Sequence, residues 1–140
     1  MRAALFSPNW KDQVFYVIDV TTAFLQSDPY PPEVVKYLRY RDPDTTEVRY
    51  ARLKGPIYGE ASAPKRWEQT LAPWIISQGF VRGENEKCVY HHPDRNLLVI
   101  TYVDDLAIKG RETDAQWFMN ALKQRFKCKD AEKLTADSPL

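Results

Sequence analysis

The sequence predicts an α+β domain in which helices cover one face of an antiparallel sheet. Short apolar runs that end at turn-forming residues predict strands at residues 14–18, 87–91 and 97–103. Apolar residues at helical spacing follow Ser62 and again follow Thr113, which predicts two helices. The 140 residues fit one domain, since 44% apolar residues can supply a buried core.

Two more strands are expected at residues 33–38 and 47–53, in the first half of the chain. Residues 28–32 and 41–46 are rich in Pro and Asp, and both stretches are expected to form loops. The sheet should therefore contain strands from both halves of the sequence.

The first helix is predicted to begin with Ser62 as its N-cap and to end at Gly79. Pro73 lies inside this span and should kink or divide the helix. The second helix should begin at Thr113, which forms a capping-box pattern with Gln116. Its expected common face carries Phe118, Ala121, Leu122 and Arg125.

Tyr102-Val103-Asp104-Asp105 joins an apolar run to the short run at residues 106–108, which predicts a hairpin with two carboxylates at its tip. A plain solvated turn is one explanation, because Asp is common in turns. A bound cation is the other, because it would relieve the repulsion between adjacent carboxylates.

Asp19 changes the balance between these explanations, because it follows the apolar strand at residues 14–18. If that strand lies beside the hairpin, Asp19 can face Asp104. Mg²⁺ prefers such carboxylate oxygens. Two such ions can hold both the attacking and the leaving oxygen of a phosphoryl transfer.

Several other residues have ordinary structural explanations. Trp67 and Trp74 are seven residues apart on one helix face, which favours core packing. His91 and His92 are expected in a solvated turn, because the chain has no further histidine and its two cysteines lack a ligand spacing.

The charge and hydropathy of the chain limit the kinds of partner that it is expected to bind. The chain carries 20 basic and 19 acidic residues, so it lacks the basic excess of many free-standing nucleic-acid-binding proteins. Its apolar runs are far shorter than the roughly 20 residues that cross a bilayer, and its first residues are not expected to act as a secretory signal. We expect no membrane partner and an intracellular setting of unknown compartment.

Four blocks of the sequence resemble the reverse transcriptases of Ty1/copia-type retrotransposons. Asp19-Val-Thr-Thr-Ala-Phe24 resembles their first catalytic motif, and Tyr102-Val-Asp-Asp105 resembles their second. Residues 53–67, with Tyr58-Gly59, Ala63-Pro64 and Trp67, resemble the block between these motifs, and residues 126–130 resemble the segment after the hairpin. A Tyr-x-Asp-Asp match alone would be weak, whereas these four blocks occur in the family's order.

The resemblance implies RNA-directed DNA polymerase activity with two Mg²⁺ ions, or Mn²⁺ in their place. It implies that catalysis and metal binding rest on Asp19, Asp104 and Asp105, with the carbonyl of Val20. The nucleotide-binding residues that it implies are Thr22, Ala23, Phe24, Tyr58, Gly59 and Lys129. Phe24 would be a steric gate against the ribose 2′-hydroxyl, and Lys129 would lie near the departing pyrophosphate.

The implied partners are a primed RNA or DNA template, deoxynucleoside triphosphates and the rest of a larger polyprotein. Tyr102 and Val103 are the implied contacts of primer and template. Packing is an equally good explanation for Tyr102. The family usually has Leu-Lys-Gln after Tyr-Gly, but this chain has Glu60-Ala61-Ser62, which puts an acidic group beside the expected nucleotide pocket.

The resemblance also divides the chain into three parts. Residues 1–12 are an N-terminal extension, residues 13–130 are a polymerase palm with part of the fingers and no thumb, and residues 131–140 are a polar tail without a regular element. We expect a piece of a larger polyprotein, a truncated gene product or an element relic.

Two other functions stay open. An inactive palm-fold remnant of a transposable element would neither bind nucleotide nor extend primers. A small ferredoxin-like RNA-binding module shares the sheet-and-two-helix plan, but its aromatic strand motif is absent and the three carboxylates would repel RNA without a metal. A palm-like nucleotide cyclase is more remote, because its glycine-rich turn is absent.

Overall fold

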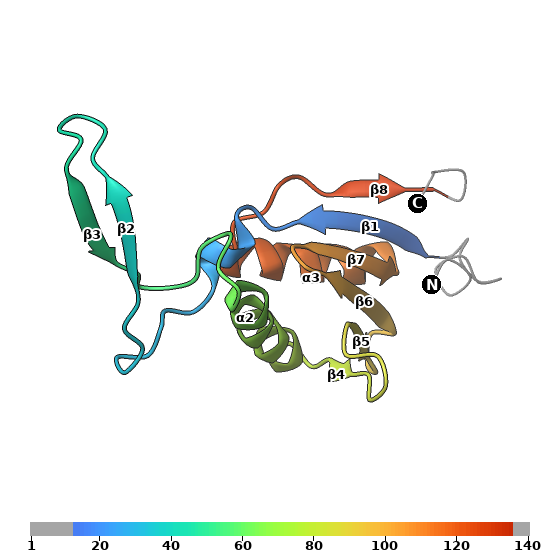
Figure 1. Cartoon of the computed structure of the whole chain (residues 1–140). Helices are drawn as coiled ribbons and strands as arrows, with labels where there is room; N and C mark the ends of the chain where they lie inside the picture. Colours follow the sequence, from blue (N-terminus) through green and yellow to red (C-terminus); the bar gives the residue numbers. More distant parts are fainter. Residues whose placement is uncertain (1–12, 136–140) are drawn as a thin grey trace.

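The computed structural model describes residues 13–135 of the 140-residue chain. Its body is a six-stranded antiparallel sheet in the order β4-β5-β6-β7-β1-β8 (Figure 1). These strands are β1 (Val14–Asp19), β4 (Val81–Arg82), β5 (Val89–His92), β6 (Leu97–Tyr102), β7 (Asp105–Gly110) and β8 (Glu132–Leu134). The helices are α2 (Ala63–Ser77) and α3 (Glu112–Arg125), and a short 3₁₀ helix, η2, covers Ala23–Gln26.

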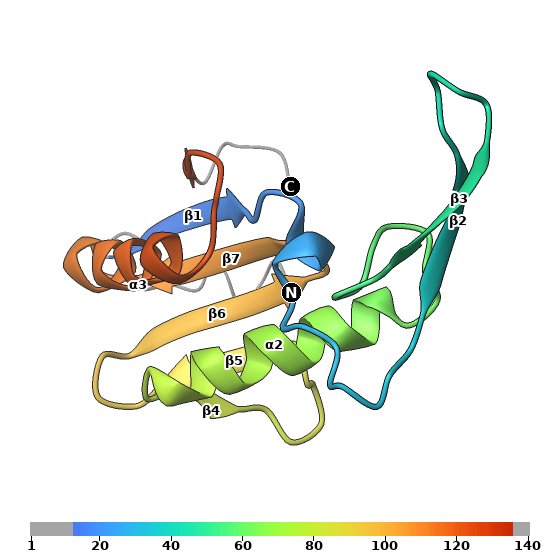
Figure 2. The same cartoon turned by 90° about the vertical axis from the view of Figure 1, so that its left-hand side faces the viewer.

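A separate two-stranded ribbon is formed by β2 (Tyr37–Arg41) and β3 (Val48–Arg52). It extends away from the sheet and helices in both views (Figures 1 and 2). The α+β class expected from the sequence is confirmed, with a mostly antiparallel sheet and two helices.

The six-stranded sheet has two different faces, because successive residues of a strand point to opposite sides. Even-numbered residues of β1, such as Tyr16 and Ile18, join the core that includes both helices. Odd-numbered residues, such as Phe15 and Val17, belong to a smaller apolar cluster on the opposite face. We call this second side the open face, because neither helix contributes to its cluster.

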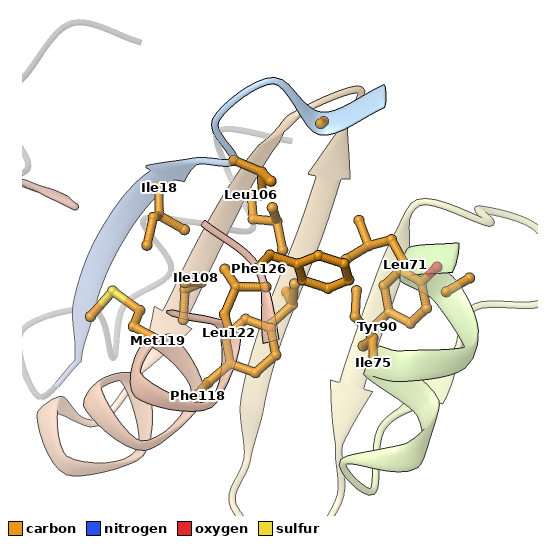
Figure 3. Packing of buried hydrophobic residues seen from close by; sticks show 14 of the residues in the cluster. Ile18, Leu71, Ile75, Tyr90, Leu106, Ile108, Phe118, Met119, Leu122 and Phe126 are labelled. Carbon is orange, nitrogen blue, oxygen red and sulfur yellow. The ribbon is translucent and has the colours of Figure 1, made fainter. Parts of the chain in front are cut away.

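The main core fills the space between the sheet and the two helices (Figure 3). Phe118 and Leu122 of α3 and Ile75 of α2 are fully buried and meet Leu106 and Ile108 of β7 within it. Aromatic rings connect the two helices, since Trp74 lies 5.7 Å from both Phe118 and Phe126, measured between ring centroids. Trp67 is also buried, which confirms its expected core packing.

The first helix is not divided at Pro73, because α2 is one continuous element of 15 residues. Proline removes one backbone hydrogen bond, the one to the carbonyl of Gln69. Both Pro73 and Gln69 are exposed, so water can satisfy that carbonyl. Gly79 follows the C-cap with φ of +99°, as predicted for the end of this helix.

The N-caps are not used as the sequence suggested. Ser62 stands at the N-cap of α2, but its side chain makes no capping hydrogen bond. Helix α3 begins at Glu112, with Arg111 as N-cap, so Thr113 lies inside the first turn. The Tyr16 hydroxyl donates to the carboxylate of Glu112 at 2.7 Å, which ties this earlier start to β1.

The expected face of α3 is only partly right. Arg125 is exposed, and its guanidinium pairs with Asp28 at 3.3 Å. The buried residues of the helix are Ala115, Phe118, Met119 and Leu122.

One expected strand is misplaced, and one observed strand was not expected. The strand predicted at residues 33–38 begins instead at Tyr37, because Pro31 to Val34 form a turn closed by a 2.9 Å backbone hydrogen bond. The expectation of no regular element after Asp130 is wrong, since β8 pairs with β1 from Glu132 to Leu134. Residues 1–12 and 136–140 of the expected terminal segments lie outside the described residues.

The expectation for His92 is also wrong. His91 and His92 belong to β5, and His92 is buried against the rings of Phe80 and Trp117, with centroid distances of 5.1 and 5.7 Å. No helix within residues 13–135 combines the length and apolar character needed to cross a bilayer.

Candidate metal centre

The three carboxylates singled out in the sequence meet at one end of the sheet. Strands β1 and β7 pair so that Asp19 lies directly opposite Asp105, and β6 places Tyr102 opposite Asp105 on the other side. Directly opposite residues of antiparallel strands project to the same face. Asp19, Asp105 and Tyr102 therefore project from the open face, away from the helices.

Asp104 joins this group from the turn between β6 and β7. Val103 has a positive φ of 51°, an uncommon conformation for a β-branched residue, so surrounding contacts must hold the turn. The Trp67 indole donates a hydrogen bond to the Val103 carbonyl at 2.8 Å. The Val20 amide donates to the Asp104 carbonyl, also at 2.8 Å.

The carboxylates of Asp19, Asp104 and Asp105 each offer an oxygen within 4.8 Å of the others. Burial raises the pKa of Asp105, and a hydrogen bond and negative charge from Asp19 and the charge of Asp104 raise it further. The repulsion that raises this pKa is the repulsion that a cation would remove. An all-oxygen carboxylate set of this kind fits a hard divalent cation such as Mg²⁺.

Lys129 supplies a positive charge beside this cluster. Its ammonium lies 3.2 Å from a carboxylate oxygen of Asp19, and its backbone amide donates to the Asp19 carbonyl at 2.9 Å. The two residues before Lys129 also contact the chain just after Asp19. Val20 forms a β-bridge with Cys128, and the Thr21 amide donates to the Lys127 carbonyl. The segment after α3 thus holds the carboxyl end of β1.

Some of the residues expected to bind nucleotide lie next to each other. The rings of Phe24 and Tyr58 are 4.6 Å apart between centroids. Phe24 is buried, whereas Tyr58 is 50% exposed. Thr22 and Gly59 have positive φ values of 44° and 89°, so each allows a sharp change of chain direction next to this ring pair.

Ala23 is placed differently from its neighbours. It is completely buried and belongs to the main core, so its methyl group does not face solvent. Tyr102 and Val103 are strongly exposed, so packing does not explain Tyr102. Their contact with primer and template stays a prediction.

Glu60, the acidic residue that departs from the family pattern, is held in a polar network. The Lys36 ammonium and the Tyr30 hydroxyl each donate to its carboxylate at 2.5 Å. Lys36 and then Tyr30 are the main causes that lower the pKa of Glu60 to about 2. The acidic charge beside the expected nucleotide pocket is thereby paired with a basic one.

An apolar cavity of about 370 Å³ lies beside the turn between β6 and β7, bordered by α2 and strands β5 and β6. Its lining includes Trp67, Leu71, Tyr90, Thr101, Tyr102 and Val103. Tyr102 and Val103, which directly precede Asp104 and Asp105, thus line the cavity.

Sequence reasoning missed two supports of this site. Trp67 is expected in the core and lies there, but its N–H also fixes the turn, which the sequence did not predict. A tryptophan donor needs a partner when buried, which is a signal that a partner exists but not where. Lys36 was not recognised as the partner of Glu60, because the two are 24 residues apart.

The fold and site define a class: an antiparallel α+β domain with an acidic oxygen cluster suited to a divalent cation. Residues 5–136 match the family described as reverse transcriptase (RNA-dependent DNA polymerase). The chain belongs to this family, and the resemblance to Ty1/copia-type retrotransposons is confirmed by its relatives.

Among the relatives, the chain is 30% identical over 124 residues to the Retrovirus-related Pol polyprotein from transposon RE2 of Arabidopsis thaliana, an alignment that covers 84% of this chain and 8% of that protein. It is 27% identical over 103 residues to the Pol polyprotein from transposon TNT 1-94 of Nicotiana tabacum, covering 68% of this chain and 7% of that protein. It is 33% identical over 97 residues to the putative transposon Ty5-1 protein of Saccharomyces cerevisiae, an alignment that covers 65% of this chain and 30% of that protein. The chain thus spans less than a tenth of the Pol polyproteins that it matches.

Proposed function

We propose that this domain carries out template-directed transfer of deoxynucleotides to a primer 3′-hydroxyl, as an RNA-directed DNA polymerase palm with part of the fingers in residues 13–130. The observation that carries the proposal is the convergence of Asp19, Asp104 and Asp105 from two separate chain segments. The partners would be a primed RNA or DNA template, deoxynucleoside triphosphates and the rest of a Pol polyprotein.

The family resemblance implies two Mg²⁺ ions, which Asp19 and Asp104 would hold, with Asp105 and the Val20 carbonyl in lesser roles; the convergence of the three carboxylates supports metal binding there. Bound there, such ions would lower the pKa of the attacking hydroxyl and stabilise the leaving oxygen. The protein itself has little covalent chemistry to perform in phosphoryl transfer, so its residues mainly position the reactants.

Lys129 fits a role at the leaving group. Its ammonium already lies beside Asp19, so a pyrophosphate that leaves this centre would meet a positive charge there. On the other side of the centre, the exposed Tyr102 is available to contact the primer strand.

Phe24 fits the role of a gate against ribonucleotides. A gate must not move away from the 2′-hydroxyl, and the Phe24 ring is buried and packed against Tyr58. The pairing of Glu60 with Lys36 supports nucleotide binding in spite of the acidic substitution, because it offsets a charge that would repel a triphosphate.

Primer extension by the purified chain tests this function. With a labelled primer on an RNA template, Mg²⁺ and deoxynucleotides, the chain should extend the primer, and Asp104→Asn should abolish extension while the circular dichroism spectrum is unchanged. Asp94→Asn is the matched control, because Asp94 is exposed in the turn between β5 and β6. Extension retained by Asp104→Asn contradicts the proposal.

Metal binding provides a readout that does not depend on activity. Electron paramagnetic resonance of Mn²⁺ should show weaker binding to Asp19→Asn and Asp104→Asn than to Asp94→Asn. A chain that binds Mn²⁺ but extends no primer would be an inactive palm-fold remnant.

A further inference from the structure

The β2–β3 ribbon presents two different faces to solvent. All five residues of each strand are exposed. The register pairs Tyr37 with Arg52, Arg39 with Tyr50 and Arg41 with Val48 on one side. We call this side the Arg–Tyr face. The opposite face carries Leu38, Tyr40, Arg49 and Ala51.

The Arg–Tyr face alternates charge and aromatic rings across the two strands. Arg39 lies opposite Tyr50, and Arg52 lies opposite Tyr37, so each ring has a guanidinium as its cross-strand neighbour. Tyr37 and Tyr50 are 60% and 66% exposed. Tyr37 and Tyr50 are diagonal neighbours across the two strands. Such neighbours lie about 7–8 Å apart, so each ring has room to contact a separate planar group.

The positive charge of this face is not neutralised by nearby carboxylates. Within residues 13–135, Arg39, Arg41 and Arg52 make no ion pair. Arg41 and Arg52 donate instead to the backbone carbonyls of Thr46 and Pro32, which leaves their charge in place.

Two of the three acidic residues in the loop between the strands pair with an arginine of the opposite face. Asp42 and Glu47, in the loop between the strands, pair with Arg49 at 2.9 and 3.6 Å. Arg49 belongs to the opposite face, so these two carboxylates do not oppose an anion on the Arg–Tyr face.

We propose that the Arg–Tyr face binds single-stranded nucleic acid. Arginines would contact phosphates, and unpaired bases would stack on Tyr37 and Tyr50, the combination by which proteins hold single strands without reading their sequence. A duplex would offer phosphates but no free base faces to the tyrosines.

The position of the ribbon suits this role and rests on the proposed function. Strand β1 ends at Asp19 and β7 begins at Asp105 at the end of the sheet nearer to the ribbon (Figure 1). A template strand that leaves the carboxylate cluster on that side would run toward the ribbon. The strand bound there would be unpaired template.

Fluorescence anisotropy of a labelled 12-nucleotide oligo(dT) or oligo(rU) tests the proposal with the full chain, in EDTA and without nucleotides. Tyr50→Ala should weaken binding about fivefold or more, as expected for one lost stacked base. Tyr40→Ala is the matched control, because it removes the same side chain from the same ribbon on the opposite face. It should leave the affinity within about twofold of the intact chain.

The charge contribution has its own variant. Arg39→Gln should weaken binding and reduce the slope of log affinity against log salt by about 0.7, the value for one phosphate contact on a single strand. Lys123→Gln removes the same charge from the exposed surface of α3 and should leave that slope unchanged.

Three results would overturn the inference: no binding of either oligonucleotide by the intact chain at 50 mM salt, equal losses for Tyr50→Ala and Tyr40→Ala, or competition by an acidic peptide as effective as that by unlabelled oligo(dT). Asp104→Asn should keep full strand binding. Primer extension without strand binding to the ribbon would refute this inference alone, and strand binding without extension would refute the polymerase function alone.

Discussion

The body of the molecule and the β2–β3 ribbon differ in how much of their side-chain surface is buried. The body buries more than twenty apolar side chains between the sheet and two helices, whereas every strand residue of the ribbon is exposed. A lone two-stranded hairpin is at best marginally stable in water. The residues of the body are therefore constrained by core packing, whereas the residues of the ribbon have no core to fill and can instead form a binding surface.

The ribbon is attached to the body by polar contacts at its base. The Leu53 amide donates to the Lys36 carbonyl at 2.9 Å, and the Lys36 ammonium reaches Glu60 just before α2. The guanidinium of Arg66, in the first turns of α2, lies 4.7 Å from the centre of the Tyr30 ring. These contacts can orient the ribbon without any buried apolar interface.

The largest expected difference between the two regions is in stability. Phe118→Ala should lower the free energy of unfolding by about 3–5 kcal/mol, since this ring is completely buried between Trp74 and Phe80. Leu38→Ala in the ribbon should change it by no more than about 0.5 kcal/mol. Urea unfolding followed by far-ultraviolet circular dichroism measures both, and similar losses would show that the ribbon shares the body's cooperative core.

A smaller effect is expected where the core meets the carboxylate turn. Trp67→Phe removes the hydrogen bond to the Val103 carbonyl and should cost about 1–2 kcal/mol of stability. It should also weaken Mn²⁺ binding, because the turn that carries Asp104 loses a support. Trp74→Phe is the control, since Trp74 packs on the same Phe126 ring, and it should not change Mn²⁺ affinity. Unchanged affinity in both variants would limit Trp67 to packing.

The smallest expected effect is the pH dependence of stability that comes from Glu60, at the base of the ribbon. The pKa of Glu60 is lowered from about 4.5 to about 2, so its paired, ionised form contributes stability above the ordinary pKa. That contribution should be lost as the pH falls through about 2. The carboxyl carbon of Glu60 should titrate near pH 2 in nuclear magnetic resonance spectra. Lys36→Met should move this midpoint back toward 4.5, and no movement would exclude Lys36 as the main cause.

The sequence predicted the body better than the ribbon, for a physical reason. Most residues of β1, β6 and β7 are buried or half-buried, and burial produces the apolar runs from which these strands were predicted. Their convergence could then be predicted from the position of Asp at a strand end and from the resemblance to a known family. In the exposed ribbon, the strand expected at residues 47–53 is confirmed as β3, but β2 was misplaced and the cross-strand pairs could not be derived.

Other features depended on contacts between distant residues. The strand β8 has only three residues, two of them charged, and it forms because the edge of β1 offers hydrogen-bonding groups. The burial of His92 depends on the neighbouring rings of Phe80 and Trp117 from other parts of the chain. The link from Trp67 to Val103 joins a helix to a turn 36 residues later, and no local pattern indicates it.

The return of the chain after α3 has a consequence for the order of events during synthesis. Gln26, close to Asp19, exchanges side-chain hydrogen bonds with the backbone of Lys127, 101 residues later. Until the ribosome has released that later stretch, β1 lacks its β8 neighbour and exposes an unpaired strand edge, which is prone to wrong pairing. The ion pair of Asp19 with Lys129 and the pairing of β1 with β8 can therefore form only after the segment that follows α3 has been made, well after Asp19 itself.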